Sequence, residues 1–140
     1  MSIDQCALRR KYLQKKIVDG VAIIFNANEV TRNSDCHYKY RSDSYFHYFS
    51  YFPEPDSVIF ILAGDKPQSI LFCRQKNPDL ETWEGFRFGP DAARVKYGFD
   101  EAYSIDKIGE IAPKLIAKFK SIYTPLDADQ KIQNQIQGWI

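Results

Sequence analysis

The sequence SVIFILAGDKPQSILFCR, residues 57–74, decides the fold. It holds two runs rich in apolar and β-branched residues, 57–64 and 68–74, joined by the segment GDKP. Residues of this kind favour strands, and a short connection with Gly and Pro favours a reversal of the chain. We therefore expect an antiparallel hairpin here.

Upstream, VAIIF at residues 21–25 is a continuous apolar run, typical of a strand buried on both faces and covered by helices. Segment 26–41 is rich in turn formers and predicts a long loop. The other expected elements are a helix at 4–18 that stops at Gly20, a short helix capped by Ser42 or Ser44, helices at 90–97 and 105–119 with Pro113 kinking or restarting the second, a short strand at 121–126, and a last helix capped by Asp127. The fold class is α/β: a mixed sheet of about six strands flanked by helices.

The expected first helix carries a basic cluster of Arg9, Arg10, Lys11, Lys15 and Lys16. Such a cluster is either a binding patch or the solvated face of an amphipathic helix, and we favour the solvated face. The residues expected to line the opposite side are Ala7, Leu8, Tyr12 and either Ile17 or Val18.

The composition limits the classes of protein to which this chain can belong. The 140 residues fit one domain, and the high aromatic share of 15% predicts an aromatic-rich core. A net charge of +1 argues against a nucleic-acid partner. Three separated cysteines predict reduced thiols and a cytoplasmic location. The sequence has no signal-like start and no apolar run near the roughly 18 residues of a membrane span, so we expect no membrane partner.

Five residues with metal-ligating or nucleophilic side chains lie close together in the sequence: Asp35, Cys36, His37, Asp43 and His47. Their spacing matches no metal-binding motif, and residues adjacent in sequence rarely form a catalytic triad. Glycine-rich phosphate loops are also absent from the sequence. We therefore expect no catalytic residue and no metal ligand within this chain.

Two aromatic stretches call for an explanation. Eight of the fifteen residues in YKYRSDSYFHYFSYF, 38–52, are Tyr or Phe, which suits a packed core, a stacking surface for bases or a docking face. The residues that flank this stretch are neutral to acidic, which disfavours a stacking surface for nucleic-acid bases. The second stretch, ETWEGFRFGPDAARVKYG at 81–98, places Trp83 among polar neighbours in what reads as a loop. An indole there serves a pocket or an interface, or it covers the domain's own core.

Together these stretches resemble the N-terminal domain of Xaa-Pro aminopeptidase, also called aminopeptidase P. The resemblance covers nearly the whole chain and rests on two ordered motifs. Their residues are Arg32, Asp35, Tyr38, Tyr40, Arg41, Ser44, Phe46, Tyr48, Glu54, Pro55 and Asp56, followed by Glu81, Trp83, Gly85, Arg87 and Gly89. One departure concerns a turn, because Ser50-Tyr51-Phe52 stands where the family usually has Thr-Gly-Phe.

The resemblance implies that residues 1–140 form a single non-catalytic N-terminal domain. In this family a C-terminal domain of pita-bread fold, absent from this chain, holds two divalent metal ions, usually manganese, and removes the first residue from peptides with proline second. The implied partners are that domain, further copies in a dimer or tetramer, and the peptide substrate. Trp83, Asp35 and Arg41 are the implied residues of a substrate pocket or subunit interface. We also expect further chain to cover an exposed Trp139-Ile140 pair.

Two other classes stay open. The chain could be the matching domain of a prolidase, a creatinase or an inactive pita-bread protein that acts as a binding module. It could also be an unrelated interaction domain. The Glu-x-Trp-x-Gly stretch favours the aminopeptidase.

Overall fold

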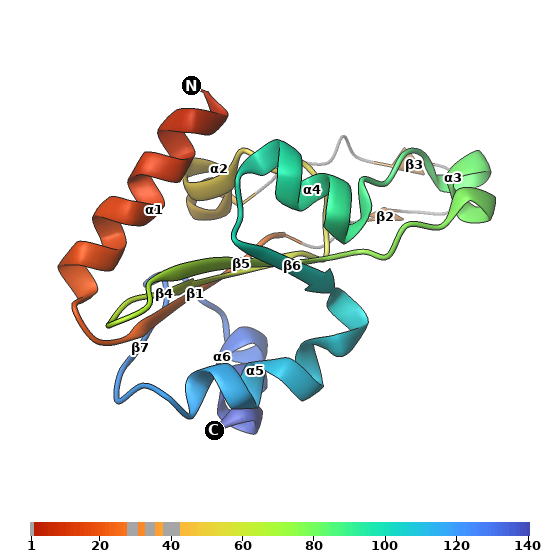
Figure 1. Cartoon of the computed structure of the whole chain (residues 1–140). Helices are drawn as coiled ribbons and strands as arrows, with labels where there is room; N and C mark the ends of the chain where they lie inside the picture. Colours follow the sequence, from red (N-terminus) through yellow and green to blue (C-terminus); the bar gives the residue numbers. More distant parts are fainter. Residues whose placement is uncertain (1, 28–30, 33–35, 38–42) are drawn as a thin grey trace.

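The computed structural model describes the chain except residues 1, 28–30, 33–35 and 38–42 (Figure 1). Its centre is a five-stranded mixed sheet in the order β6-β5-β4-β1-β7. The strands are β1 (Val21–Phe25), β4 (Val58–Leu62), β5 (Gln68–Cys73), β6 (Glu101–Ser104) and β7 (Ile122–Tyr123). The expected hairpin is confirmed: β4 pairs antiparallel with β5 and with β1, while β6 and β7 add parallel edges. The short strands β2 (Thr31–Arg32) and β3 (Cys36–His37) pair separately, within the segment expected to be a loop.

Helices cover both faces of the sheet, as the apolar run of β1 predicts (Figure 1). One face packs against α1 (Ile3–Ile17), α2 (Ser44–Ser50) and α4 (Gly89–Tyr97). The other packs against α5 (Ile108–Ile116) and α6 (Gln130–Trp139). Alternate residues of each strand point to opposite faces, so neighbours such as Ile59 and Phe60 belong to different cores.

The structure corrects several boundaries. Strand β6 and helix α3 (Pro78–Glu84) were not expected, and α3 means that Trp83 lies on a helix rather than in a loop. The caps also differ: Asp43, not Ser42 or Ser44, caps α2, and Asp129, not Asp127, caps α6. In both cases a carboxylate accepts the backbone N–H of the third helical residue, which satisfies one of the orphan donors of the first turn.

The expectation for the first helix was wrong about which side faces the core. Leu8, Tyr12 and Val18 are exposed, whereas Ile17 does pack against the sheet. The inward stripe is Ile3, Cys6, Arg10, Leu13 and Ile17, spaced three or four residues apart. An arginine interrupts this stripe, so the apolar pattern of the sequence misses it.

Arg10 is 1% exposed and binds the carboxyl ends of two helices. Its Nη1 donates to the carbonyl of Phe49 in α2 at 2.7 Å, and its Nη2 donates to the carbonyls of Tyr97 and Gly98 at the end of α4, at 3.1 and 3.0 Å. The last carbonyls of a helix lack partners within the helix and carry its negative dipole end, which suits a cation. The guanidinium also lies 4.1 Å above the centre of the Phe99 ring.

Burial acts on the ionisable groups of this region. Desolvation lowers the pKa of Arg10 to about 10, which leaves the group charged at neutral pH. Burial raises the pKa of the thiols of Cys6 and Cys73, that of Cys73 to about 12, and both are free cysteines.

Within the described residues, no helix is long and apolar enough to cross a membrane.

The expectation of an exposed Trp139-Ile140 pair was wrong for the tryptophan. Trp139 is 8% exposed, and its ring lies 6.0 Å from that of Phe25 and 5.9 Å from that of Phe60. It continues the inward stripe of α6 one turn beyond Ile136. Of these two residues, Ile140 is the exposed one.

The departure from the family turn has a physical explanation. Tyr51 ends α2 in the left-handed conformation, with φ 61° and ψ 8°. Glycine adopts this conformation freely, whereas a side chain strains it, so the family's usual glycine suits the same geometry. The Tyr51 ring lies 4.7 Å from that of His47, a contact that offsets part of the strain.

Replacing Arg10 by Met should lower the free energy of unfolding by about 3 kcal/mol, because it leaves buried or half-buried carbonyls without donors. Denaturant unfolding of the 140-residue chain measures this. Lys11→Met, an exposed change on the same helix, is the control and should alter stability by less than about 0.5 kcal/mol. Equal effects of the two changes would contradict the capping role of Arg10.

Replacing Tyr51 by Gly should raise the free energy of unfolding by about 1 kcal/mol, because it relieves the left-handed strain. The matched control is Tyr45→Gly, since Tyr45 is similarly exposed but lies within α2. That change should lower stability by about 1 kcal/mol. A loss of stability from Tyr51→Gly would mean that the contact with His47 outweighs the strain.

Candidate functional site

Residues 75–88, which lie between β5 and α4, form an extension that we call the Trp83 arm. It carries α3, which Figure 1 shows at the end of the molecule, away from both helical layers. No described residue of α3 is buried, and Trp83 is 87% exposed. The interpretation of Trp83 as a cover for the domain's own core is therefore wrong. Its exposure leaves the large apolar surface of an indole in contact with solvent on the arm.

Two further apolar side chains of the arm face solvent. Leu80 is 38% exposed and Phe86 is 63% exposed. Aromatic residues of this kind are enriched at the centres of protein interfaces and in ligand pockets. The arm thus presents apolar area at the edge of an otherwise well-packed domain.

A buried glutamate anchors the base of the arm. Glu54 is 5% exposed, its Oε2 accepts the backbone N–H of Phe88 at 2.7 Å, and its Oε1 lies 3.4 Å from the guanidinium of Arg74. Its carbonyl accepts from the side chains of Asn26 and Ser57. One residue therefore connects the end of the arm to Arg74, directly after β5, and to the turn before β4.

A second polar cluster, the arm clamp of Lys76, Glu81 and Arg87, closes around α3. Glu81 Oε1 accepts from Lys76 Nζ at 2.8 Å and from the backbone N–H of Arg87 at 2.7 Å. Lys76 Nζ also donates to the carbonyl of Arg87 at 2.7 Å. The pKa of Glu81 is lowered mainly by the hydrogen bond from Lys76, and secondly by the hydrogen bond from the backbone N–H of Arg87. The clamp therefore joins the residues just before and just after the helix.

Two glycines of the second motif take backbone conformations that other residues adopt only with strain. Gly85 ends α3 at φ 96°, and Gly89 begins α4 at φ 77°. At Gly89 an added Cβ would also lie 2.9 Å from Cβ of Lys76. These glycines permit the sharp turns on either side of Phe86–Phe88.

The positions of the other expected site residues relative to Trp83 are not described. Asp35 and Arg41 lie outside the described residues, and of Cys36 and His37 only the backbone, in β3, is described. Asp43 serves as the cap of α2, and His47 packs against Tyr51. Within the described part of the chain, no three His, Cys, Asp or Glu residues are grouped so that they could hold a metal ion. We assign no metal to these residues.

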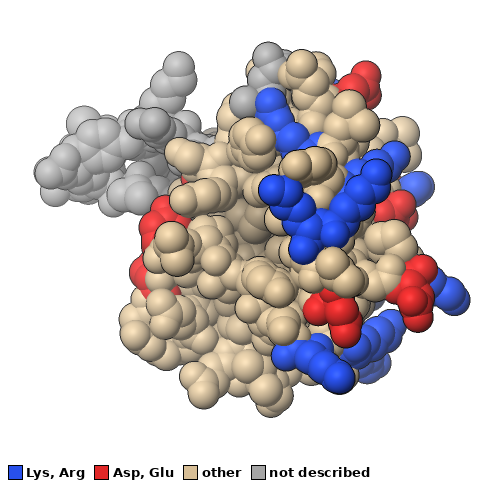
Figure 2. Space-filling view, turned by 90° about the vertical axis from the view of Figure 1, so that its left-hand side faces the viewer, with Lys and Arg blue, Asp and Glu red and all other residues tan. Residues whose placement is uncertain are grey.

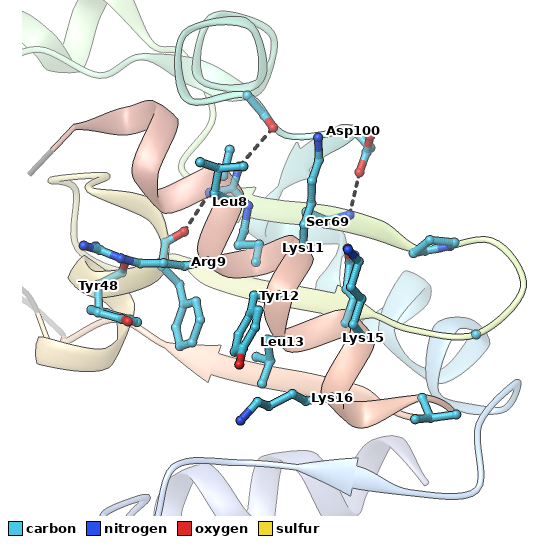
Figure 3. A pocket seen from close by; sticks show the side chains of 18 residues that line it. Leu8, Arg9, Lys11, Tyr12, Leu13, Lys15, Lys16, Tyr48, Ser69 and Asp100 are labelled. Carbon is cyan, nitrogen blue, oxygen red and sulfur yellow. Dashed lines mark hydrogen bonds between the residues drawn. The ribbon is translucent and has the colours of Figure 1, made fainter.

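The outer side of α1 is a second exposed surface, with Lys and Arg side chains gathered on it in Figure 2. A broad groove of about 1100 Å³ runs along it, lined among others by Leu8, Arg9, Tyr12 and Tyr48. Figure 3 shows Arg9 lying over Tyr48, and its guanidinium carbon is 4.1 Å from the ring centre. The basic cluster thus divides, because Arg10 turns inward while Lys11, Lys15 and Lys16 are exposed, as expected of a solvated face.

Comparison with known proteins assigns the family. Residues 6–123 match the family described as aminopeptidase P, N-terminal domain. The chain belongs to that family. The alternative of an unrelated interaction domain is therefore excluded.

The relatives and solved structures of this aminopeptidase P N-terminal domain agree with the assignment. An Xaa-Pro aminopeptidase of Haemophilus influenzae is 36% identical over 106 residues, which cover 75% of this chain and 25% of that protein. The structure of Pseudomonas aeruginosa aminopeptidase PepP superposes with a TM-score of 0.94 at 35% identity, over 100% of this chain and 32% of that one. Zinc-substituted aminopeptidase P of Escherichia coli in complex with product gives 0.93 at 31% identity, over 99% and 32%. The chain spans about a quarter of the length of the curated relatives it matches.

The sequence singles out Trp83 as a candidate site residue, but it does not predict the contacts that support the arm around it. Glu54 and Glu81 belong to the quoted motifs, so their identity was visible although their partners were not. Lys76 carried no signal, because a single lysine in a polar segment is ordinary. Its role depends on a fold that brings it back to Arg87.

Proposed function

We propose that this chain is the non-catalytic N-terminal domain of an Xaa-Pro aminopeptidase and that Trp83 contributes to its substrate pocket. The longer protein removes the first residue from peptides whose second residue is proline. The catalytic step belongs to a C-terminal domain of pita-bread fold beyond these residues. The 140-residue chain alone hydrolyses no peptide.

The observation that carries this proposal is an indole 87% exposed at the position of tryptophan in the family's second motif. Proline has a flat apolar ring, which packs well on an aromatic face. A rigid domain that holds such a face at its edge can define one wall of a pocket whose other walls lie elsewhere. That pocket is completed by the catalytic domain of the same chain or of a neighbouring copy.

The remaining parts of the proposal follow the family. Asp35 places a negative charge near the amino end of the substrate, and Arg41 makes polar contacts at the rim of the same pocket or subunit interface. The C-terminal domain holds two divalent metal ions, manganese in the natural enzyme, which supply an activated water. The protein works in the cytoplasm as a dimer or tetramer. Relatives named as Xaa-Pro aminopeptidases support this reading over a prolidase, a creatinase or an inactive binding module.

Replacing Trp83 by Ala in the longer protein should lower kcat/KM for an Xaa-Pro peptide by roughly 5- to 150-fold, about 1–3 kcal/mol of transition-state stabilisation. The thermal midpoint of the 140-residue chain should stay unchanged, because the side chain is exposed. Steady-state kinetics and thermal unfolding measure the two effects.

The control is Trp139→Ala, which truncates the buried tryptophan and should cost about 3–5 kcal/mol of stability. An unaltered kcat/KM for the Trp83 variant would refute the pocket role. A large fall in its midpoint would instead assign the residue to the core.

A further inference from the structure

Hydrophobic packing contributes little to the position of helix α3, since Leu80 is the most covered apolar side chain described in it and is still 38% exposed. None of the α3 residues whose side chains the structure describes is buried, and Trp83 meets solvent over most of its surface. A helix of two turns is unstable by itself in water. Its local support is Pro78 in the first turn and the Asn77 side chain, which caps it by accepting from Leu80 N–H at 3.3 Å. Those groups favour helix formation but do not fix its direction.

The arm clamp supplies that direction. Lys76 precedes the helix, Glu81 lies in its middle and Arg87 follows it, and three hydrogen bonds of 2.7 to 2.8 Å join them. The Lys76 ammonium also lies 4.2 Å above the Phe86 ring. Lys76 therefore contacts α3 itself through Glu81, and the residues that follow the helix through Phe86 and Arg87.

We propose that Lys76 and Glu81 are positioning residues for Trp83, holding α3 so that the indole meets the proline side of the substrate in one orientation. This inference rests on the proposed role of Trp83 as a pocket wall. Neither residue touches the substrate. Their effect passes through the orientation of the helix, because a contact misplaced by about 1 Å can lower a rate substantially.

The clamp is well suited to this role because Lys76 and Glu81 lie outside the two apolar cores, although the Glu81 side chain is only 14% exposed. Lys76 keeps 42% of its side chain exposed, so breaking the clamp removes no core packing. The base of the arm stays attached through Glu54 and Phe88 N–H. A loss of the clamp should thus loosen α3 while leaving the two cores of the domain intact.

The first test measures the motion of the indole directly. In a Trp139→Phe background of the 140-residue chain, Trp83 is the sole tryptophan, and its time-resolved fluorescence anisotropy reports local motion. Lys76→Met should add a fast depolarising component that the parent lacks, with the thermal midpoint unchanged. Lys76→Arg, which keeps the charge and the donors, should restore the parent decay. Lys66→Met, in the β4–β5 turn, is the control and should change nothing. An unchanged decay in Lys76→Met would overturn the inference.

The second test uses the longer protein and an Xaa-Pro peptide. Lys76→Met should lower kcat/KM by about 10-fold, and it should have no further effect once Trp83 is Ala, because both changes act on one contact. Independent, multiplying effects would overturn the inference. If Trp83→Ala alone leaves kcat/KM unaltered, the proposed function fails, whatever the anisotropy shows. If Trp83→Ala lowers kcat/KM and Lys76→Met does not, the proposed function stands and the positioning role fails.

Discussion

A buried guanidinium organises one whole side of this domain. Arg10 donates to carbonyls at the ends of α2 and α4, so a single side chain satisfies groups that neither helix can satisfy internally. The neighbouring Gln14 extends the attachment, since its amide donates to the carbonyls of Leu62 and Gln68 at the end of the hairpin. Helix α1 is therefore held by polar contacts to two helix ends and to the hairpin, in addition to the apolar packing of Ile3, Leu13 and Ile17. Leu8 and Tyr12 do not belong to this inward stripe and are exposed.

The sequence predicts best the parts that are stabilised locally. The hairpin and the buried strand β1 were recognised because their apolar runs and turn are contiguous in the chain. Helix α3 was missed because a helix without a buried face has no apolar period to detect. The inward stripe of α1 was missed because its central residue is charged, and the carbonyls that satisfy Arg10 lie up to 88 residues away. Long-range polar partners of this kind leave no local pattern.

The candidate site shows the same division. The exposure of Trp83 followed from its polar neighbours, but the geometry that presents it did not. In the structure the five residues of the second motif have distinct physical roles. Glu81 accepts the hydrogen bonds of the clamp, Arg87 joins the clamp through its backbone, Gly85 and Gly89 allow turns with positive φ, and Trp83 is exposed. Apart from Trp83, the residues of this motif thus shape the backbone around the helix that carries the indole. Asp35 and Arg41 remain predictions, because they lie outside the described residues.

Under the proposed function, a well-packed domain holds Trp83 in place for a partner surface that completes a pocket. A crystal structure of the longer protein with an Xaa-Pro peptide or its product tests this most directly. The indole should lie within about 4.5 Å of the proline ring, with the clamp intact. An indole that remains in solvent, away from the substrate in every copy of the assembly, would contradict it.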